Sequence, residues 1–386
     1  MASATVVAGM ALLPFAAATL RAGEAPPPMP DTAPVEQESS LESTLEKIWN
    51  LPMLYNNPDN PVLQKLAITG RYQGQYYWLD SDKGDADDWE NRRWWIGADM
   101  TIFKKLRIKG DIEINDDLNP FYSNLYEAYI SYKHSDEFLL GFGRREFLWS
   151  DEYKSSKYVL TFERSLLIEQ LRPSTATGLW AAGKVGNVVY DAGVYFGSLD
   201  SELGSFDEGN FYTLSIGYDL AEQMGWKKSL VKLDWLINDT DAGSDVPKPY
   251  DHALSLIWSA EKDRYGIGTD IMYGAGEGST ADVFGISVIP TYDLTDKLEL
   301  ILRYQFATSD GDGLRAPGRY LGKAPNLTDG GVGDEFHAFY GGLNYYILDH
   351  RLKLMAGAEY ATMSDGDGDG GAIDGWQLMT GIRLYF

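Results

Sequence analysis

The sequence predicts an all-β protein, a transmembrane antiparallel β-barrel of about 16 strands over residues 66–386. Three observations predict this fold class. From Leu66 onward, segments of about ten residues alternate apolar and polar side chains, as in a strand whose two faces meet different solvents. Gly (41 residues), Tyr (25) and Trp (11) are abundant, which is typical of barrels with aromatic rings at both membrane interfaces. The chain also ends on an apolar strand whose last residue is Phe386.

Residues 1–25 are expected to be a cleaved signal peptide. The apolar run at 6–20 has the length of a signal-peptide core and is too short to span a bilayer. Residues 1–5 lack Lys and Arg, so a mis-set start codon and a buried helix are the alternatives. The prolines within 26–34 argue against a continuing helix.

Two short segments precede the barrel. Residues 26–42 are rich in Pro, Glu and Ser and predict a disordered linker. Residues 43–65 are expected to form a short periplasmic helix and a lead-in, because Ser43 and Glu46 make a capping-box pair. Whether this helix tucks into the barrel mouth or only bridges from the linker is left open.

The strand from Leu106 to Asn115 shows the alternation most clearly. Its odd-numbered positions from Arg107 to Glu113 carry charged side chains, and its even-numbered positions are apolar. The expected strands begin near Leu66, Arg92, Leu106, Asn124, Glu137, Thr177, Val188, Gly209, Ser229, Asp251, Tyr265, Ala281, Lys297, Glu335, Arg351 and Gly375. Short turns alternate with longer loops, which include Asp80–Glu90, Asp239–Tyr250, Ser309–Asp334 and Ser364–Asp374. Such barrels have short turns on one rim and long loops on the other.

Polar positions opposite the apolar ones are expected to line the lumen. The lumen-lining candidates are Arg71, Arg107, Lys109, Asp111, Glu113, Lys232, Asp234, Glu299, Arg303, Lys353, Glu359 and Arg383. Because both signs of charge occur, the walls are expected to create a transverse field with weak ion preference rather than to exclude one sign.

About thirty residues separate the strand that ends near Arg145 from the strand that begins near Thr177. A loop of this length in a compact fold is usually functional, so we expect it to fold into the lumen and narrow it. The candidates for constriction or solute contact are Arg144, Arg145, Lys154, Lys157, Glu163, Arg164 and Arg172. Glu163 and Arg164 either anchor the loop to the wall as an ion pair or touch the solute, and both interpretations stay open.

Several motifs of this region occur together. They are Arg92-Arg93 with Gly97 and Phe103-Lys104-Lys105, then Glu127-Ala128-Tyr129 and Gly141-Phe142-Gly143-Arg144, and finally Ser155-Ser156-Lys157 with Thr161-Phe162-Glu163-Arg164-Ser165 and Gly178-Leu179. From about Gly70 to Tyr195 the chain thus resembles the phosphate-selective porins O and P. The resemblance implies a sixteen-stranded, homotrimeric outer-membrane porin with a constricting third loop, in contact with outer-membrane lipid.

The C-terminal strand is similar to the assembly signal of outer-membrane barrels. Its signal residues are Gly381, Leu384 and Phe386. The similarity implies that the barrel-assembly machinery is a partner.

Other partners are constrained by composition. With 33 basic against 57 acidic residues, the net charge is −24, which argues against a nucleic-acid partner. The absence of Cys excludes disulfides and thiolate metal sites. Asp365, Asp367 and Asp369 match the first half of a calcium loop, but Trp376 stands where the bidentate Glu belongs, so an acidic loop is the alternative. No cofactor is expected.

We therefore expect a passive diffusion channel for small polar or charged solutes rather than an enzyme, with anions such as phosphate among the candidates. The acidic composition argues against phosphate unless the basic residues of the third loop cluster at the constriction. A polysaccharide-export channel is one alternative. A membrane-embedded hydrolase is another, although no nucleophile–base pair is evident.

Overall fold

The computed structural model describes residues 37–153, 156–198, 202–240, 248–366, 368 and 370–386. The expected signal peptide lies outside these ranges, as do residues 26–36 of the expected linker. No helix in the described ranges is both long and apolar enough to cross a membrane.

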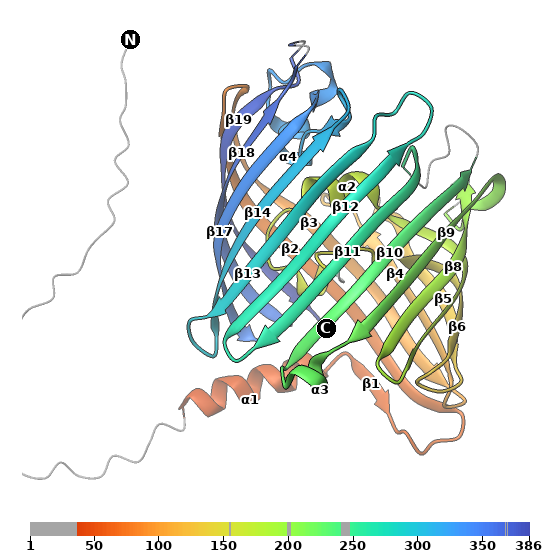
Figure 1. Ribbon diagram of the computed structural model, residues 1–386. Helices are drawn as coiled ribbons and strands as arrows, with labels where there is room; N and C mark the ends of the chain where they lie inside the picture. Colours follow the sequence, from red (N-terminus) through yellow and green to blue (C-terminus); the bar gives the residue numbers. More distant parts are fainter. Residues whose placement is uncertain (1–36, 154–155, 199–201, 241–247, 367, 369) are drawn as a thin grey trace, which may run out of the picture.

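Sixteen antiparallel strands of the described chain close into one barrel (Figure 1). The barrel strands are β2 (Leu63–Ser81), β3 (Gly84–Ile102), β4 (Leu106–Ile114), β5 (Tyr122–Lys133), β6 (Leu139–Glu146), β7 (Thr175–Val185), β8 (Val188–Ser198), β9 (Ser205–Asp219), β10 (Lys228–Thr240), β11 (Tyr250–Lys262), β12 (Tyr265–Gly276), β13 (Val283–Asp293), β14 (Leu298–Ser309), β17 (Glu335–Leu348), β18 (Leu352–Ser364) and β19 (Ile373–Tyr385). Each strand pairs with the next barrel strand, and β19 pairs with β2. The closed ring leaves no unpaired edge in the membrane, and the predicted fold class is confirmed.

The two faces of the wall differ as the alternation predicts. Ile108 on β4 lies opposite Ile130 on β5, and both side chains are about 40% exposed on the outer face. Three positions further along, Asp111 and Glu127 lie opposite each other on the inner face, where both are buried. An exposed apolar outer face and a charged inner face are what a barrel in lipid requires.

The prediction of a long loop at Asp80–Glu90 is wrong. The segment Asp80–Glu90 is almost entirely strand, because β2 runs to Ser81 and β3 begins at Gly84. Gly84 adopts φ 103°, which favours glycine and allows the tight reversal. The aspartates of this segment are exposed, whereas Glu90 is half-buried.

The segment before the barrel docks on the short-turn rim. Helix α1 (Gln37–Asn50) is followed by β1 (Met53–Asn56), which pairs with the start of β2 (Figure 1). Arg351, in the β17–β18 turn, donates to both carboxylate oxygens of Glu46 at 2.9 and 2.6 Å, and this hydrogen bonding lowers the pKa of Glu46. Trp49 Nε1 donates to the Tyr385 carbonyl at 2.8 Å.

Helix α1 corrects two expectations about this segment. It starts at Gln37 rather than Ser43, so residues 37–42 of the expected linker are helical. Gln, Glu and Leu in this stretch are good helix formers. Ser43 therefore lies inside the helix, and Glu46 contacts the barrel instead of closing a capping box.

The last residue completes the ring. The Phe386 N–H donates to Gly70 O at 3.0 Å, and the Gly70 N–H donates to Phe386 O at 3.2 Å. The Phe386 ring occupies the space where a Cβ on residue 70 would lie. Leu384 pairs with Tyr72, and Gly381 pairs with Gln75. Recognition of Gly381, Leu384 and Phe386 by an assembly machinery stays a prediction.

Two long loops fill part of the lumen from the long-loop rim. The third loop (147–174) contains a 3₁₀ turn (Ser156–Tyr158) and α2 (Leu166–Leu171). The seventh loop (310–334) contains β15 (Leu314–Arg315), α4 (Gly318–Lys323), a 3₁₀ turn (Asp329–Gly331) and β16 (Val332–Gly333). The remaining helix, α3 (Ala221–Met224), lies in the β9–β10 turn. Apolar side chains of both loops join inward side chains of the wall in one buried cluster that includes Ile168, Leu171, Phe211 and Tyr320.

Candidate functional site

The third loop crosses the lumen and is bonded to strands all around the wall. Near the start of the loop, the backbone N–H of Ser150 donates to the Asp234 carboxylate on β10. The backbone N–H of Asp151 donates to the Asp270 carboxylate on β12, and both hydrogen bonds are 2.8 Å long. Further along, Leu166 N donates to Gln305 on β14 at 2.9 Å. The loop therefore narrows the channel as the sequence predicts.

A buried ion-pair cluster fixes the middle of the loop. The Arg303 guanidinium on β14 bonds to Glu152 of the loop and to Glu359 on β18. It also donates to the Glu163 carbonyl at 2.6 Å. All three charged side chains are at most 6% exposed, so each charge depends on its partners for stabilisation.

The tip of the loop rests on basic residues of the wall. Arg71 on β2 donates to the Ser156 hydroxyl, and Lys353 on β18 donates to the Val159 carbonyl. Lys157 Nζ lies 4.8 Å from the centre of the Tyr385 ring. The tip is thus held mainly by wall cations and carbonyl or hydroxyl oxygens of the loop.

Two predicted constriction residues enclose an aromatic ring. Arg164 and Arg172 lie over Tyr153 at 4.0 and 3.9 Å. Both bond to Glu169, at 3.0 and 2.9 Å. One carboxylate and one π face therefore hold the two guanidinium groups. Glu163 and Arg164 do not form an ion pair with each other, because Arg164 bonds to Glu169 and Glu163 to other guanidinium groups. Contact of either side chain with a solute stays a prediction.

Glu163 is instead held by a residue that the sequence analysis missed. Arg319, from α4 in the seventh loop, bonds to Glu163 at 2.6 Å and to both oxygens of Glu90 on β3 at 2.8 and 2.7 Å. Its guanidinium lies 4.1 Å over the Tyr77 ring. The length of the connection Ser309–Asp334 could have predicted a functional loop here, since loops this long in a compact fold are usually functional.

The other constriction candidates separate. Arg145 faces the lumen and bonds to Asp191 on β8 at 2.9 and 2.6 Å. Arg144 does not line the constriction, which corrects the prediction. It shares a strand face with the exposed Phe142 and donates to the Glu202 carbonyl in the β8–β9 loop at 2.7 Å. Consecutive strand residues point to opposite faces. Lys154 lies outside the described residues.

The lumen-lining candidates all lie on the inner face of the wall, but most do not meet open water. Seven of the twelve are buried, largely beneath the third loop: Arg71, Asp111, Asp234, Arg303, Lys353, Glu359 and Arg383. Several of the twelve form ion pairs on the wall itself. Arg107 bonds to Asp99 at 2.8 Å, Lys109 bonds to Asp111 at 2.9 Å, and Lys232 bonds to Asp234 at 2.8 Å. Glu113 and Glu299 accept hydrogen bonds from Asn124 and Tyr346.

Strand register assembles a row of basic residues that the sequence alone did not reveal. Lys353 on β18 lies opposite Arg383 on β19, and Arg383 lies opposite Gln73 on β2. Gln73 lies opposite Arg93 on β3. This basic row (Lys353, Arg383 and Arg93) crosses four adjacent strands behind the tip of the third loop. Among the described residues, no carboxylate lies within ion-pair distance of any of the three.

The calcium candidate receives no support from its first residue. The Asp365 carboxylate accepts hydrogen bonds from the backbone amides of Gly368, Gly370 and Gly371 at 2.8–3.0 Å. Asp367 and Asp369 lie outside the described residues. In the part of the chain that is described, no three His, Cys, Asp or Glu side chains gather as metal ligands.

Comparison with known proteins agrees with this geometry. Residues 66–218 match the family described as phosphate-selective porin O and P. No curated protein matches the chain.

Solved porin structures resemble the whole barrel. OprB of Pseudomonas putida is 9% identical, with TM-score 0.59 over 83% of this chain and 94% of its own. OmpF of Salmonella typhi, solved with daunomycin, is 13% identical, with TM-score 0.56 over 83% and 98%. OmpT of Vibrio cholerae, an outer membrane protein, is 14% identical, with TM-score 0.54 over 83% and 97%. At these identities the likeness shows the fold.

Family match and fold together point to a channel and not to an enzyme. The lumen has two inserted loops, a charged inner wall and an apolar outer wall. The chain is therefore a passive diffusion channel of the bacterial outer membrane, a porin whose residues 66–218 carry the sequence pattern of the phosphate-selective porin O and P family.

Proposed function

We propose that this porin passes small polar solutes with a modest preference for anions, phosphate among them, and that it has no catalytic activity. The observation that carries the proposal is the basic row of Lys353, Arg383 and Arg93. Arg383 is 2% exposed, so its charge acts through protein of low dielectric and is weakly screened by salt.

The rest of the lumen explains why the preference is modest. Arg145, Arg164, Arg172, Arg303 and Arg319 all have carboxylate partners within 3.0 Å. A cation that is paired with a carboxylate contributes little net electric field to the rest of the lumen. The unpaired basic residues of the row lie on one side of the lumen, and a one-sided positive charge biases ion passage without excluding the opposite sign.

The proposal is tested by reversal potentials in planar bilayers across a tenfold KCl gradient and then a phosphate gradient. The wild type is expected to favour the anion. Arg93→Gln should lower the anion-to-cation permeability ratio about two- to five-fold, since a unit charge about 8 Å from the ion is worth ~0.5 kcal/mol even in water.

Lys105→Gln is the matched control. It also removes one positive charge, but Lys105 lies at the rim over the outward-facing Tyr132 ring, 5.7 Å from its centre. Clear cation selectivity of the wild type would contradict the proposed anion preference. Equal shifts in the two variants would remove the role of the basic row.

We also infer a homotrimer, as the family resemblance implies. Its support is a shallow apolar hollow on the outer face across β14, β17, β18, β19 and β2, where the small residues Gly341, Ala356 and Ala358 lie among larger ones such as Trp78 and Leu343. Small side chains let a second barrel approach closely. In the same bilayers, conductance steps should come in groups of three.

A polysaccharide-export channel is the second candidate, and the lumen argues against it. A polymer needs a continuous wide passage, whereas the third loop is bonded to β10, β12, β14 and β18 across the interior. Passage of small solutes alone fits a lumen filled in this way.

A further inference from the structure

A pocket of about 200 Å³ lies inside the barrel beside the root of the third loop. Its walls come from the end of β6, from the loop residues Phe147–Trp149 and Pro173, and from β8, β9 and β10. The volume is below the ~300–1,000 Å³ of pockets that hold drug-sized ligands. It is several times the ~30 Å³ of a water molecule, so it has room for about one small ring.

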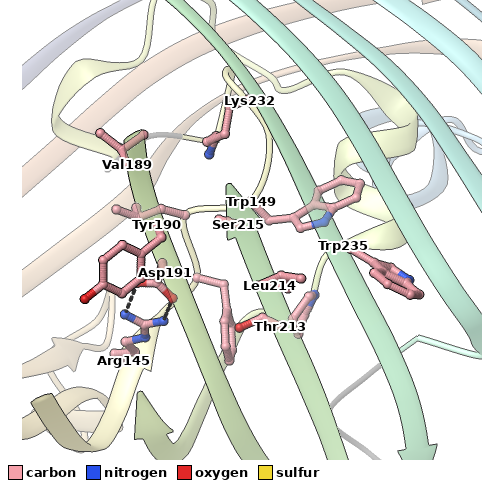
Figure 2. Close-up of a pocket in the computed structure, with 13 residues that line it drawn as sticks. Arg145, Trp149, Val189, Tyr190, Asp191, Thr213, Leu214, Ser215, Lys232 and Trp235 are labelled. Atoms are coloured by element: carbon pink, nitrogen blue, oxygen red, sulfur yellow. Dashed lines mark hydrogen bonds and ion pairs between the residues drawn. The ribbon is translucent and has the colours of Figure 1, made fainter. Parts of the chain in front are cut away.

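The charged groups of the pocket are already neutralised. Arg145 and Asp191 form a two-point ion pair at 2.9 and 2.6 Å, which Figure 2 shows as dashed lines. Lys232, a second lining residue, bonds to Asp234 at 2.8 Å. The wall therefore offers hydrogen-bond donors and acceptors without a net charge, unlike the basic row.

Trp149 supplies an aromatic wall with an unused donor. The residue is 4% exposed, and its indole Nε1 has no hydrogen-bond partner among the described residues. Figure 2 shows the indole across the pocket from the Arg145–Asp191 pair. A buried indole N–H normally has an acceptor, and none is found for it among the described residues.

These features select among solute classes. An isolated anion or cation gains no net Coulomb attraction here and loses hydration. A purely apolar solute displaces water from the Arg145–Asp191 pair without replacing its hydrogen bonds and gives the Trp149 N–H no acceptor. A ring that carries hydroxyl groups and also presents C–H faces satisfies both the polar groups and the indole.

Building on the channel function, we propose that this pocket is a binding site for an uncharged polyhydroxylated solute of monosaccharide size. The solute's hydroxyl groups bridge the Arg145–Asp191 pair and accept the Trp149 N–H, while its C–H face packs on the indole. The site is separate from the basic row and binds a different class of solute.

Glucose titrated against the KCl current of single channels tests the site. The wild-type current is expected to fall saturably with glucose. Trp149→Phe keeps a ring and loses the donor, so the half-maximal glucose concentration should rise about two- to ten-fold, the value of one net hydrogen bond. Asp191→Asn leaves Arg145 without its carboxylate partner, so glucose should bind more weakly and phosphate should begin to reduce the current.

Trp258→Phe, on the outward face of β11 and 38% exposed, is the matched control and should behave as wild type. A wild-type channel whose current ignores glucose, or equal glucose curves for Trp149→Phe and Trp258→Phe, overturns the site and leaves the channel function intact. A protein that forms no channel in KCl contradicts the channel function instead. The site is then read from tryptophan fluorescence of the detergent-folded protein, where glucose must change the wild-type emission and not that of Trp149→Phe.

Discussion

At the scale of single residues, the charged side chains of the lumen fall into two groups with different roles. Arg303 has two carboxylate partners, Glu152 and Glu359, and it belongs to a cluster that ties the third loop to the wall. Arg383 donates to the Gly74 and Ile382 carbonyls and to the Gln75 amide oxygen, all of them uncharged acceptors. The first arrangement stabilises structure, and the second leaves charge available to act on ions.

Arg303→Met is expected to release the third loop. The change leaves two buried carboxylates unpaired, and breaking a buried ion pair from one side typically costs about 3–5 kcal/mol. We expect a higher single-channel conductance and protease cleavage within residues 147–174.

Arg107→Met is the control for this change, because Arg107 pairs with Asp99 on the neighbouring strand and Asp99 keeps Lys65 as a partner. Adding Glu152→Gln and Glu359→Gln to Arg303→Met should restore part of the closed loop. Equal conductance in Arg303→Met and Arg107→Met would show that the cluster does not hold the loop.

Alternation predicted which wall residues face inward but not which of them meet water. The period of two assigns Arg107 and Arg303 to the inner face from sequence alone. Only the path of the third loop decides that Arg107 is exposed and Arg303 buried. The same period shows that Arg144 and Arg145 cannot both face the lumen. Cross-strand register, which no single strand reveals, was needed to find the basic row.

At the scale of elements, the seventh loop packs against the third loop inside the lumen and holds one of its carboxylates. Its helix α4 buries Tyr320 completely and places Arg319 between Glu90 and Glu163. The sequence showed only a long Gly-rich and Asp-rich connection there. A loop's docking depends on contacts with distant strands, which local sequence does not encode.

Arg319→Gln is expected to shift the channel toward cations. Without the guanidinium, Glu90 and Glu163 keep only partial compensation, chiefly from Arg92, whose guanidinium lies 3.9 Å from Glu163. Two carboxylates then act on the passing ion, and the reversal potential in a KCl gradient should move accordingly.

Arg315→Gln gives the matched comparison, since Arg315 lies on the same loop and is exposed. Glu163→Gln added to Arg319→Gln should reverse much of the shift. If Arg315→Gln and Arg319→Gln change the reversal potential equally, the effect comes from the overall charge of the loop and not from the Glu90–Arg319–Glu163 contact.

At the scale of the whole molecule, the stability of the barrel in the membrane depends on closure of the ring between the first and last barrel strands. The β2–β19 ladder runs from Arg71–Tyr385 to Ser81–Gly375, and the Gly70–Phe386 pair extends it by two hydrogen bonds. In hydrocarbon an unpaired backbone group costs several kcal/mol. The C-terminal residue therefore has a structural task that is distinct from the assembly signal expected from the sequence.

Two changes at the C-terminus separate these roles, with the folded fraction measured as the band that migrates faster on an unheated gel. Deletion of Phe386 removes the hydrogen bonds and should reduce refolding of the purified chain in detergent. Phe386→Ala keeps the backbone pair, so it should refold nearly as well as wild type. If the ring is also an assembly signal, Phe386→Ala should reach the outer membrane poorly in cells. Phe339→Ala removes an outward-facing ring that is 57% exposed and should be normal in both settings. Normal refolding of the deletion variant would show that barrel closure does not need the last residue. Normal levels of Phe386→Ala in the outer membrane of cells would show that the Phe386 ring is not an assembly signal.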